Sequence, residues 1–212
     1  MPGFDFTFNG LALTALPSRA LLCRDHATLI ASDLHLGRSL RGAFTGGATL
    51  PPFDAIDTLA RLEAEIAAHA PRRLILLGDS FDRSAIAPEL PPAVAAALTR
   101  ITRQVECVFV SGNHDPAEGV GALDLNGVAL RHIAGEGPDI SGHYHPKLRF
   151  AGQSFAVFLI SDRHVILPAF GTFTGGLEWR DPALRGLIPK GLAIAAAPRP
   201  FAVPLPLRLR RG

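Results

Sequence analysis

The spacing of apolar residues along the chain changes near residue 53, and it predicts strands before that point and a helix after it. Three phenylalanines alternate with polar neighbours over residues 4–8, and short apolar runs follow at 20–22 and 28–31. Such runs, separated by turn residues, are typical of β-strands. Over residues 53–69 the apolar side chains instead fall at helical spacing with alanine between them, so we predict a helix there.

Two continuous apolar runs come next, at residues 73–77 and 107–110. Runs of this kind are typical of strands that are buried on both faces of a sheet. A second helix is predicted between them over residues 91–104, with prolines at its start. Together with the strand that ends at residue 31, these elements predict a βαβαβ core with parallel pairing.

Helical spacing stops at about residue 127, and the remaining chain again shows the pattern of strands. The strands predicted there are bounded by Gly or Asp turns and cover residues 128–132, 155–160, 164–167 and 192–197. We expect this second half to form another sheet that packs on the first, which makes the fold class α/β.

The composition agrees with a globular protein and excludes a membrane-spanning one. At 212 residues, with 48% apolar and 19% charged residues, the chain can bury one core and is predicted to form a single domain over residues 1–212. Every apolar run is too short to span a bilayer, so no membrane partner is expected. The first residues lack the features of a signal peptide, which predicts a cytoplasmic location. The net charge of +2 does not by itself suggest nucleic acid.

Five short polar clusters interrupt the apolar pattern, and we expect each to lie just after a strand. In chain order they are Asp33-Leu34-His35, Gly78-Asp79-Ser80-Phe81-Asp82, Gly112-Asn113-His114-Asp115, the single His132, and Gly142-His143-Tyr144-His145. In open α/β sheets, ligand sites gather at the carboxyl ends of strands, where the connecting loops converge. The clusters supply two Asp, one Asn and four His as metal ligands, with one His left over. That set can hold two divalent ions, a centre typical of hydrolases that act on phosphate esters.

The clusters differ in how specific they are. Asp-x-His alone carries no information, Gly-Asp-x-x-Asp is common turn sequence, Gly-His-x-His is moderately specific and Gly-Asn-His-Asp is strongly so. Asp33 and His35 could share a face through strand alternation or through a turn. His132 counts as a ligand because the set needs it.

The cysteines and the histidines outside the clusters limit which atoms are expected to bind a metal. Cys23 and Cys107 stand in apolar, strand-like sequence and are predicted to be buried free thiols, so a metal would be held by oxygen and nitrogen. The three remaining histidines are predicted to lie at the surface or in turns: His26, His69 and His164.

The ordered set over residues 33–145 resembles the signature of the calcineurin-like metallophosphoesterases. Three segments resemble, more narrowly, a bacterial branch of ligase-associated DNA-damage-response endonucleases, also described as helicase-associated phosphoesterases. They are Asp33-Leu-His-Leu-Gly-Arg, Gly142-His-Tyr-His-Pro and Leu167-Pro-Ala-Phe-Gly-Thr-Phe-Thr-Gly-Gly. The resemblance implies a four-layer αββα sandwich of two packed mixed β-sheets flanked by helices.

The resemblance also implies a role for each site residue. One ion would be held by Asp33, His35 and His145, and the other by Asn113, His132 and His143, with Asp79 bridging the two. Mn(II) is the expected metal, and Fe or Zn would also suit this donor set. His114 resembles the catalytic histidine of the family, which would donate a hydrogen bond or a proton to the departing oxygen, with Asp115 or Asp82 orienting it. Arg38 and Arg83 are candidates for contact with the substrate phosphate.

The leading hypothesis is a Mn-dependent phosphodiesterase that cuts DNA, as an endonuclease in repair. DNA ligase and helicase partners are implied by the resemblance alone. Two alternatives stay open. The same metal pair would serve a phosphodiesterase or phosphomonoesterase acting on small nucleotide-type substrates, and the fold could also serve as a non-catalytic scaffold. A shallow site edged by Arg would favour DNA, whereas a deep closed pocket would favour small substrates.

Overall fold

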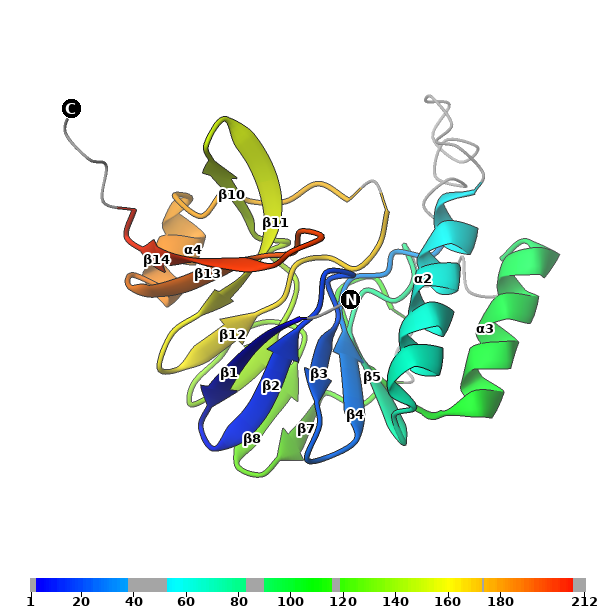
Figure 1. Cartoon of the computed structure of the whole chain (residues 1–212). Coiled ribbons are helices and arrows are strands. Elements are labelled where there is room, and N and C mark those ends of the chain that lie inside the picture. Colours follow the sequence, from blue (N-terminus) through cyan, green and yellow to red (C-terminus); the bar gives the residue numbers. More distant parts are fainter. Residues whose placement is uncertain (1–2, 38–52, 83–89, 116–118, 173, 208–212) are drawn as a thin grey trace.

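The computed structural model describes residues 3–37, 53–82, 90–115, 119–172 and 174–207. Over these residues the chain forms two mixed β-sheets that pack face to face, with helices on the outside (Figure 1). Arg38 and Arg83, the two residues predicted to contact substrate phosphate, lie outside the described residues.

Within the described residues, the first sheet has six strands that follow one another in chain order. They are β1 (Phe4–Phe8), β2 (Leu11–Ala15), β3 (Leu21–Cys23), β4 (Thr28–Ala31), β5 (Arg73–Leu77) and β6 (Glu106–Val110). Strands β1 to β4 pair antiparallel, whereas β4, β5 and β6 pair parallel. The parallel trio confirms the predicted βαβαβ core.

The second sheet contains eight strands among the described residues, in the order β14-β13-β11-β12-β9-β8-β7, with β10 paired to β11. Their bounds are β7 (Ala122–Leu125), β8 (Val128–Arg131), β9 (Asp139–Ser141), β10 (Lys147–Phe150), β11 (Gln153–Ile160), β12 (His164–Ile166), β13 (Gly191–Ala195) and β14 (Phe201–Leu205). Strands β8, β9 and β12 pair parallel in the middle of this sheet. Each sheet therefore has its own group of parallel strands, at one edge of the first sheet and in the middle of the second.

Helices α2 (Asp54–His69) and α3 (Pro92–Gln104) cover the outer face of the first sheet, beside β4 and β5 in Figure 1. Each begins one residue later than predicted and ends where predicted. The expectation that helices stop near residue 127 is wrong, because α4 (Pro182–Leu187) follows, with Asp181 capping its start. A helix of six residues is too short to show helical periodicity in the sequence. Among the described helices, none is long and apolar enough to cross a membrane.

Three apolar clusters hold the four layers together. The largest lies between the two sheets and includes Leu13, Ile75 and Phe158. A second joins the first sheet to α2 and α3, and a third packs Trp179 and α4 against the outer face of the second sheet. The predicted αββα order is therefore confirmed, with an outer helical layer on the second sheet that is much thinner than that on the first.

The two cysteines are free thiols, of which Cys23 is buried and Cys107 is only half-buried. Burial raises the pKa of Cys107 to about 11, and it also raises the pKa of Cys23. A raised pKa leaves less thiolate at a given pH, and the thiolate is the reactive form. We therefore expect both thiols to react with Ellman's reagent at pH 8 at least about tenfold more slowly in the native protein than in urea. Equal rates in the two states would contradict this burial.

Candidate metal centre

The polar clusters lie at the carboxyl ends of the parallel strands of both sheets. Three of them follow β4, β5 and β6 of the first sheet, and two follow β8 and β9 of the second. Main-chain bonds join these loops, since Asp33 N–H donates to Gly78 O over 3.1 Å and Gly142 N–H donates to His132 O over 3.0 Å. Between the two sheets, His143 N–H donates to Asp33 Oδ2 over 3.0 Å, so the sandwich brings residues 110 positions apart to one edge.

One group of donor atoms consists of Asp33, His35 and His145, whose ligand atoms all lie within 4.8 Å of one another. The Nε2 atoms of His35 and His145 face each other at 3.3 Å. Asp33 Oδ1 lies 3.1 Å from His145 Nε2, yet it is buried and makes no hydrogen bond. A buried carboxylate oxygen without a donor normally carries a large desolvation cost, which a bound cation would offset.

A second group consists of Asp79, His132 and His143, again with all ligand atoms within 4.8 Å. His132 Nε2 lies 3.4 Å from Asp79 Oδ2 and 3.1 Å from His143 Nδ1. The other ring nitrogen of His132, Nδ1, is 2.9 Å from Leu77 O and donates to that carbonyl. This bond leaves Nε2 free to ligate, which is the arrangement that protein metal sites use to fix a histidine tautomer.

The protonation of His35 and His143 suits metal ligation. Burial lowers the pKa of His35 to about 4, and burial followed by the charge of His132 lowers the pKa of His143. These two rings are therefore neutral at pH 7 and present lone pairs. Burial alone would lower the pKa of His132 as well, but its bond to Asp79 and the charge of Asp33 raise it. The carboxylates thus favour a positive charge at this point of the site.

Asp79 is the carboxylate of the second donor group, and it contacts both His132 and the loop that carries His114. Burial alone would raise its pKa, but the bond and charge of His132 together with the His114 N–H hold it well below the usual range. Asp79 Oδ1 accepts the His114 N–H over 3.0 Å, while Oδ2 faces His132. Carboxylate oxygens and neutral imidazoles in two groups of three fit a pair of divalent cations such as Mn, Fe or Zn.

The main chain at the site is strained. Five candidate ligands have left-handed backbone angles: Asp33 (φ 56°), His35 (φ 48°), Asp79 (φ 48°), His143 (φ 70°) and His145 (φ 47°). This conformation costs roughly 1–2 kcal/mol per non-glycine residue and is concentrated at functional sites. It also settles how Asp33 and His35 come to share a face. Strand β4 ends at Ala31, so a turn rather than strand alternation places both side chains.

Asn113 and His114 lie at the open side of the site, and both are exposed. Asn113 lines a cavity of about 400 Å³ together with His132. The His114 ring centroid lies 5.9 Å from that of His35. Because only the main-chain N–H of His114 is used by Asp79, its imidazole remains available to a substrate.

The two aspartates predicted to orient His114 have other contacts. Asp115 accepts main-chain N–H groups from Phe81 and Gly112, each over 3.0 Å, so it ties together the loops that follow β5 and β6. Asp82 is buried, and its Oδ1 lies 3.8 Å from His35 Nδ1. These contacts position the loops and the His35 ring, and through the loops they position His114.

The histidines outside the clusters are partly as predicted. His26 lies in an exposed turn, and His69 ends α2 beside Glu65. The prediction for His164 is wrong, because this residue is buried in β12 and its Nδ1 lies 2.9 Å from Asp139 Oδ1. Asp139 stands in the neighbouring parallel strand β9, so the pairing that buries His164 is not visible in its local sequence.

Sequence reasoning missed the residues that support Asp33. Ser32 Oγ donates to Asp33 Oδ2 over 2.6 Å, and the His143 N–H donates to the same oxygen over 3.0 Å. The main chain of residues 167–171 closes over this loop, where Phe170 N–H donates to Ser32 O and Gly171 N–H donates to Asp33 O. The Leu167-Pro-Ala-Phe-Gly sequence pointed to this segment, but not to its main-chain role.

Gly142 is a position where this support leaves no room for a side chain. A Cβ there would collide with Ser32 Oγ and Asp33 Oδ2. We expect Gly142→Ala to lower metal affinity about 10–100-fold, the usual effect of disturbing the groups that orient ligands. Metal content by mass spectrometry after dialysis measures this. Gly186→Ala, where a Cβ meets nothing within 4 Å, is the matched control. Native metal content in Gly142→Ala would show that a side chain at this position does not disturb the metal ligands.

Comparisons with known proteins found a matching family model and similar solved structures. The family model for calcineurin-like phosphoesterases matches residues 26–187. The crystal structure of the Pseudomonas putida nuclease MPE is similar with a TM-score of 0.74 and 25% identity, covering 95% of this chain and 98% of that one. YfcE, a phosphoesterase from E. coli, is similar with a TM-score of 0.40 and 17% identity, covering 71% of this chain and 83% of that one.

Among curated proteins, none matches the chain. The family model spans most of the sequence, and its range includes all five polar clusters together with α2, α3 and the parallel strands of both sheets. The chain therefore belongs to the calcineurin-like phosphoesterase family.

Proposed function

We propose that this protein is a metal-dependent phosphodiesterase that hydrolyses DNA as an endonuclease, with residues 1–212 acting as one metallophosphoesterase domain. The observation that carries the proposal is the pair of three-residue donor groups, in which ring nitrogens and carboxylate oxygens face one another at 3.1–3.4 Å. The similarity to a nuclease over nearly the whole of both chains supports nucleic acid as the substrate.

Asp33, His35 and His145 would hold one ion, and His132, His143 and Asn113 the other, with Asp79 between them. Mn(II) is our first choice, and Fe or Zn would fit the same donors. When bound, such a pair lowers the pKa of water and offsets the charge that develops on the phosphate oxygens. The surrounding protein keeps His35 and His143 neutral for this purpose by burying them.

His114 is the residue best placed to supply a proton. Its ring is exposed beside the first donor group, and its main chain is fixed by Asp79, so the imidazole can reach the oxygen that departs from phosphorus. Transfer of a proton to that oxygen avoids an unstable alkoxide product. Asp115 holds the loop that carries His114 and acts as a positioning residue rather than as a partner in the reaction.

The open position of Asn113 and His114 favours a polymer over a small, fully enclosed substrate. A role in DNA repair, with a DNA ligase and a helicase as partners, is part of the proposal and follows from the resemblance of the three sequence segments. A phosphodiesterase for small nucleotide-type substrates is the second candidate, since the same donor groups would serve it.

One experiment separates these candidates. Purified protein is incubated with Mn(II) or with chelator on supercoiled plasmid, single-stranded DNA and a small aryl phosphodiester. We expect nicking of DNA that requires Mn(II), is lost with chelator and returns when Mn(II) is restored. Activity limited to the small ester would exclude the nuclease. If the metal-loaded protein is inactive on all three substrates, the result would favour the alternative in which the fold is a non-catalytic scaffold.

A further inference from the structure

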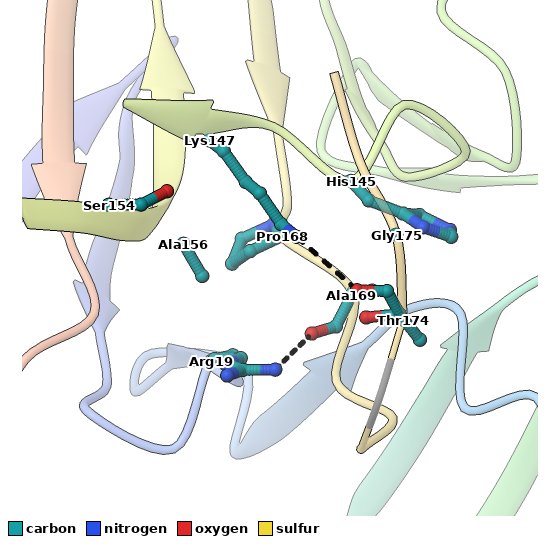
Figure 2. Close-up of a pocket in the computed structure, with 9 residues that line it drawn as sticks. All are labelled: Arg19, His145, Lys147, Ser154, Ala156, Pro168, Ala169, Thr174 and Gly175. Atoms are coloured by element: carbon teal, nitrogen blue, oxygen red, sulfur yellow. Dashed lines mark hydrogen bonds between the residues drawn. The ribbon is translucent and has the colours of Figure 1, made fainter. Parts of the chain in front are cut away.

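A second cavity of about 350 Å³ adjoins the candidate metal centre and shares one wall with it (Figure 2). His145, a member of the first donor group, lines this cavity. Two cationic side chains face it from opposite sides: Lys147 from the start of β10, and Arg19 from the turn between β2 and β3. The remaining wall comes from β11 and from residues on both sides of Thr172, including Ala169 and Thr174.

Arg19 is held rigidly and carries an unneutralised charge. Its backbone has a φ of 81°, and its Nη1 donates to Ala169 O and Gly171 O over 3.3 and 3.4 Å. No carboxylate of the described residues lies within ion-pair distance of it. Burial lowers its pKa, and the charge of Arg61 lowers it further, which is the effect of a cation near another cation. Nitrogen donors of the guanidinium beyond Nη1 remain for a ligand.

Lys147 is held by a single contact. Its Nζ donates to Thr174 O over 3.4 Å, which leaves further ammonium protons for a ligand. Glu178 pairs with Lys147 through the main chain, but its carboxylate accepts from the N–H groups of Arg149 and Arg180 instead. Over the ranges that the structure describes, Lys147 therefore has no carboxylate partner either.

We propose that the cavity formed by Arg19, Lys147 and His145 binds a non-scissile phosphate of a polynucleotide, next to the phosphate that is cleaved. This inference rests on the proposed function. Two cations without carboxylate partners form a site for an anion, and phosphate is the anion that a nuclease substrate presents beside its scissile group. Because His145 lines this cavity and also belongs to the first donor group, an anion bound there would lie beside the candidate metal centre, as a neighbouring phosphate of the same strand would. A small diester with a single phosphate has nothing to place there.

The test measures binding of a labelled single-stranded 12-mer by fluorescence anisotropy at several KCl concentrations. The His114→Ala background with Mn(II) bound slows cleavage during the measurement. Removing one phosphate contact reduces the slope of log Kd against log salt by about 0.7 for a single strand. We expect Lys147→Gln and Arg19→Gln each to show that reduction, with Kd weakened about tenfold at low salt. Lys147→Arg should restore the slope.

Lys190 is the other lysine of the chain, exposed and outside the cavity lining, and Lys190→Gln serves as the matched control. Melting temperatures are measured in parallel, because Arg19 also fastens residues 169 and 171. A weaker Kd with an unchanged slope would assign the cavity to a sugar or base and overturn the proposal. Equal Kd and slope in Lys147→Gln and the parent would overturn it as well.

Two comparisons complete the design. A 12-mer with and without a 5′-terminal phosphate distinguishes an end phosphate from an internal one, and either result supports a non-scissile phosphate. For cleavage, the loss caused by Lys147→Gln should be larger on the 12-mer than on a dinucleoside monophosphate, and equal losses would overturn the proposal. Failure of the nuclease function itself looks different, since the unsubstituted protein would then cleave no DNA at all.

Discussion

Asp79→Asn will reduce DNA cleavage to the level of the chelated protein. The amide keeps the size of the side chain and can still accept the His114 N–H, but it removes the negative charge that faces His132. The pKa of Asp79 lies well below its usual range, so the native side chain is charged throughout the working pH range. Loss of that charge removes a buried anionic group that would attract a cation to the site.

Metal content by mass spectrometry and plasmid nicking are measured together on Asp79→Asn. Asp162→Asn, which changes an exposed aspartate in the turn between β11 and β12, controls for loss of one charge. We expect the control to keep the native metal content and rate. Two metal equivalents together with native nicking in Asp79→Asn would show that this carboxylate is not a ligand.

His114→Ala will lower kcat on DNA about 10²–10⁴-fold, the usual contribution of a general acid, with both ions retained. The metal content stays unchanged because the main-chain N–H, which alanine keeps, is the group that contacts Asp79. The effect should be smaller on an aryl phosphodiester, since a good leaving group departs without a proton. A larger fall in kcat on DNA than on the aryl phosphodiester would therefore identify His114 as a proton donor.

Steady-state kinetics on both substrates measure this, with His26→Ala as a control that removes an exposed histidine of a turn. An equal fall on both substrates would assign His114 to stabilisation of the transition state rather than to protonation. A loss of bound metal would assign it to the ligand set instead.

The regular elements of the fold could be predicted because their apolar spacing is set by local sequence. Helices α2 and α3 and the parallel strands β4, β5 and β6 show long or continuous apolar patterns, and they lie where these patterns predict. Strand β9 (Asp139–Ser141) could not be found in this way. It has three residues, two of them polar, and its burial depends on pairing with strands that lie before and after it in the chain.

The candidate site likewise contains some residues that the sequence reveals and others that only the fold reveals. Polar residues that follow strands were visible in the sequence, and the structure brings Asp33, His35 and His145 together from positions 110 residues apart. The Arg19 side chain had no such signal. It stands alone in a turn, and only the fold places it opposite Lys147. Likewise, the left-handed backbone of the ligands is a property of turns that tertiary contacts hold in place.

Both donor groups take members from both sheets. Asp33 and His35 follow a strand of the first sheet and meet His145 of the second, while Asp79 of the first sheet meets His132 and His143. An ion held by either group is therefore a cross-link that closes a loop of about 50 to 110 residues, much as a disulfide does. Bound metal would therefore add to the stability that the apolar cluster between the sheets provides, and this added stability would rise with the concentration of free metal.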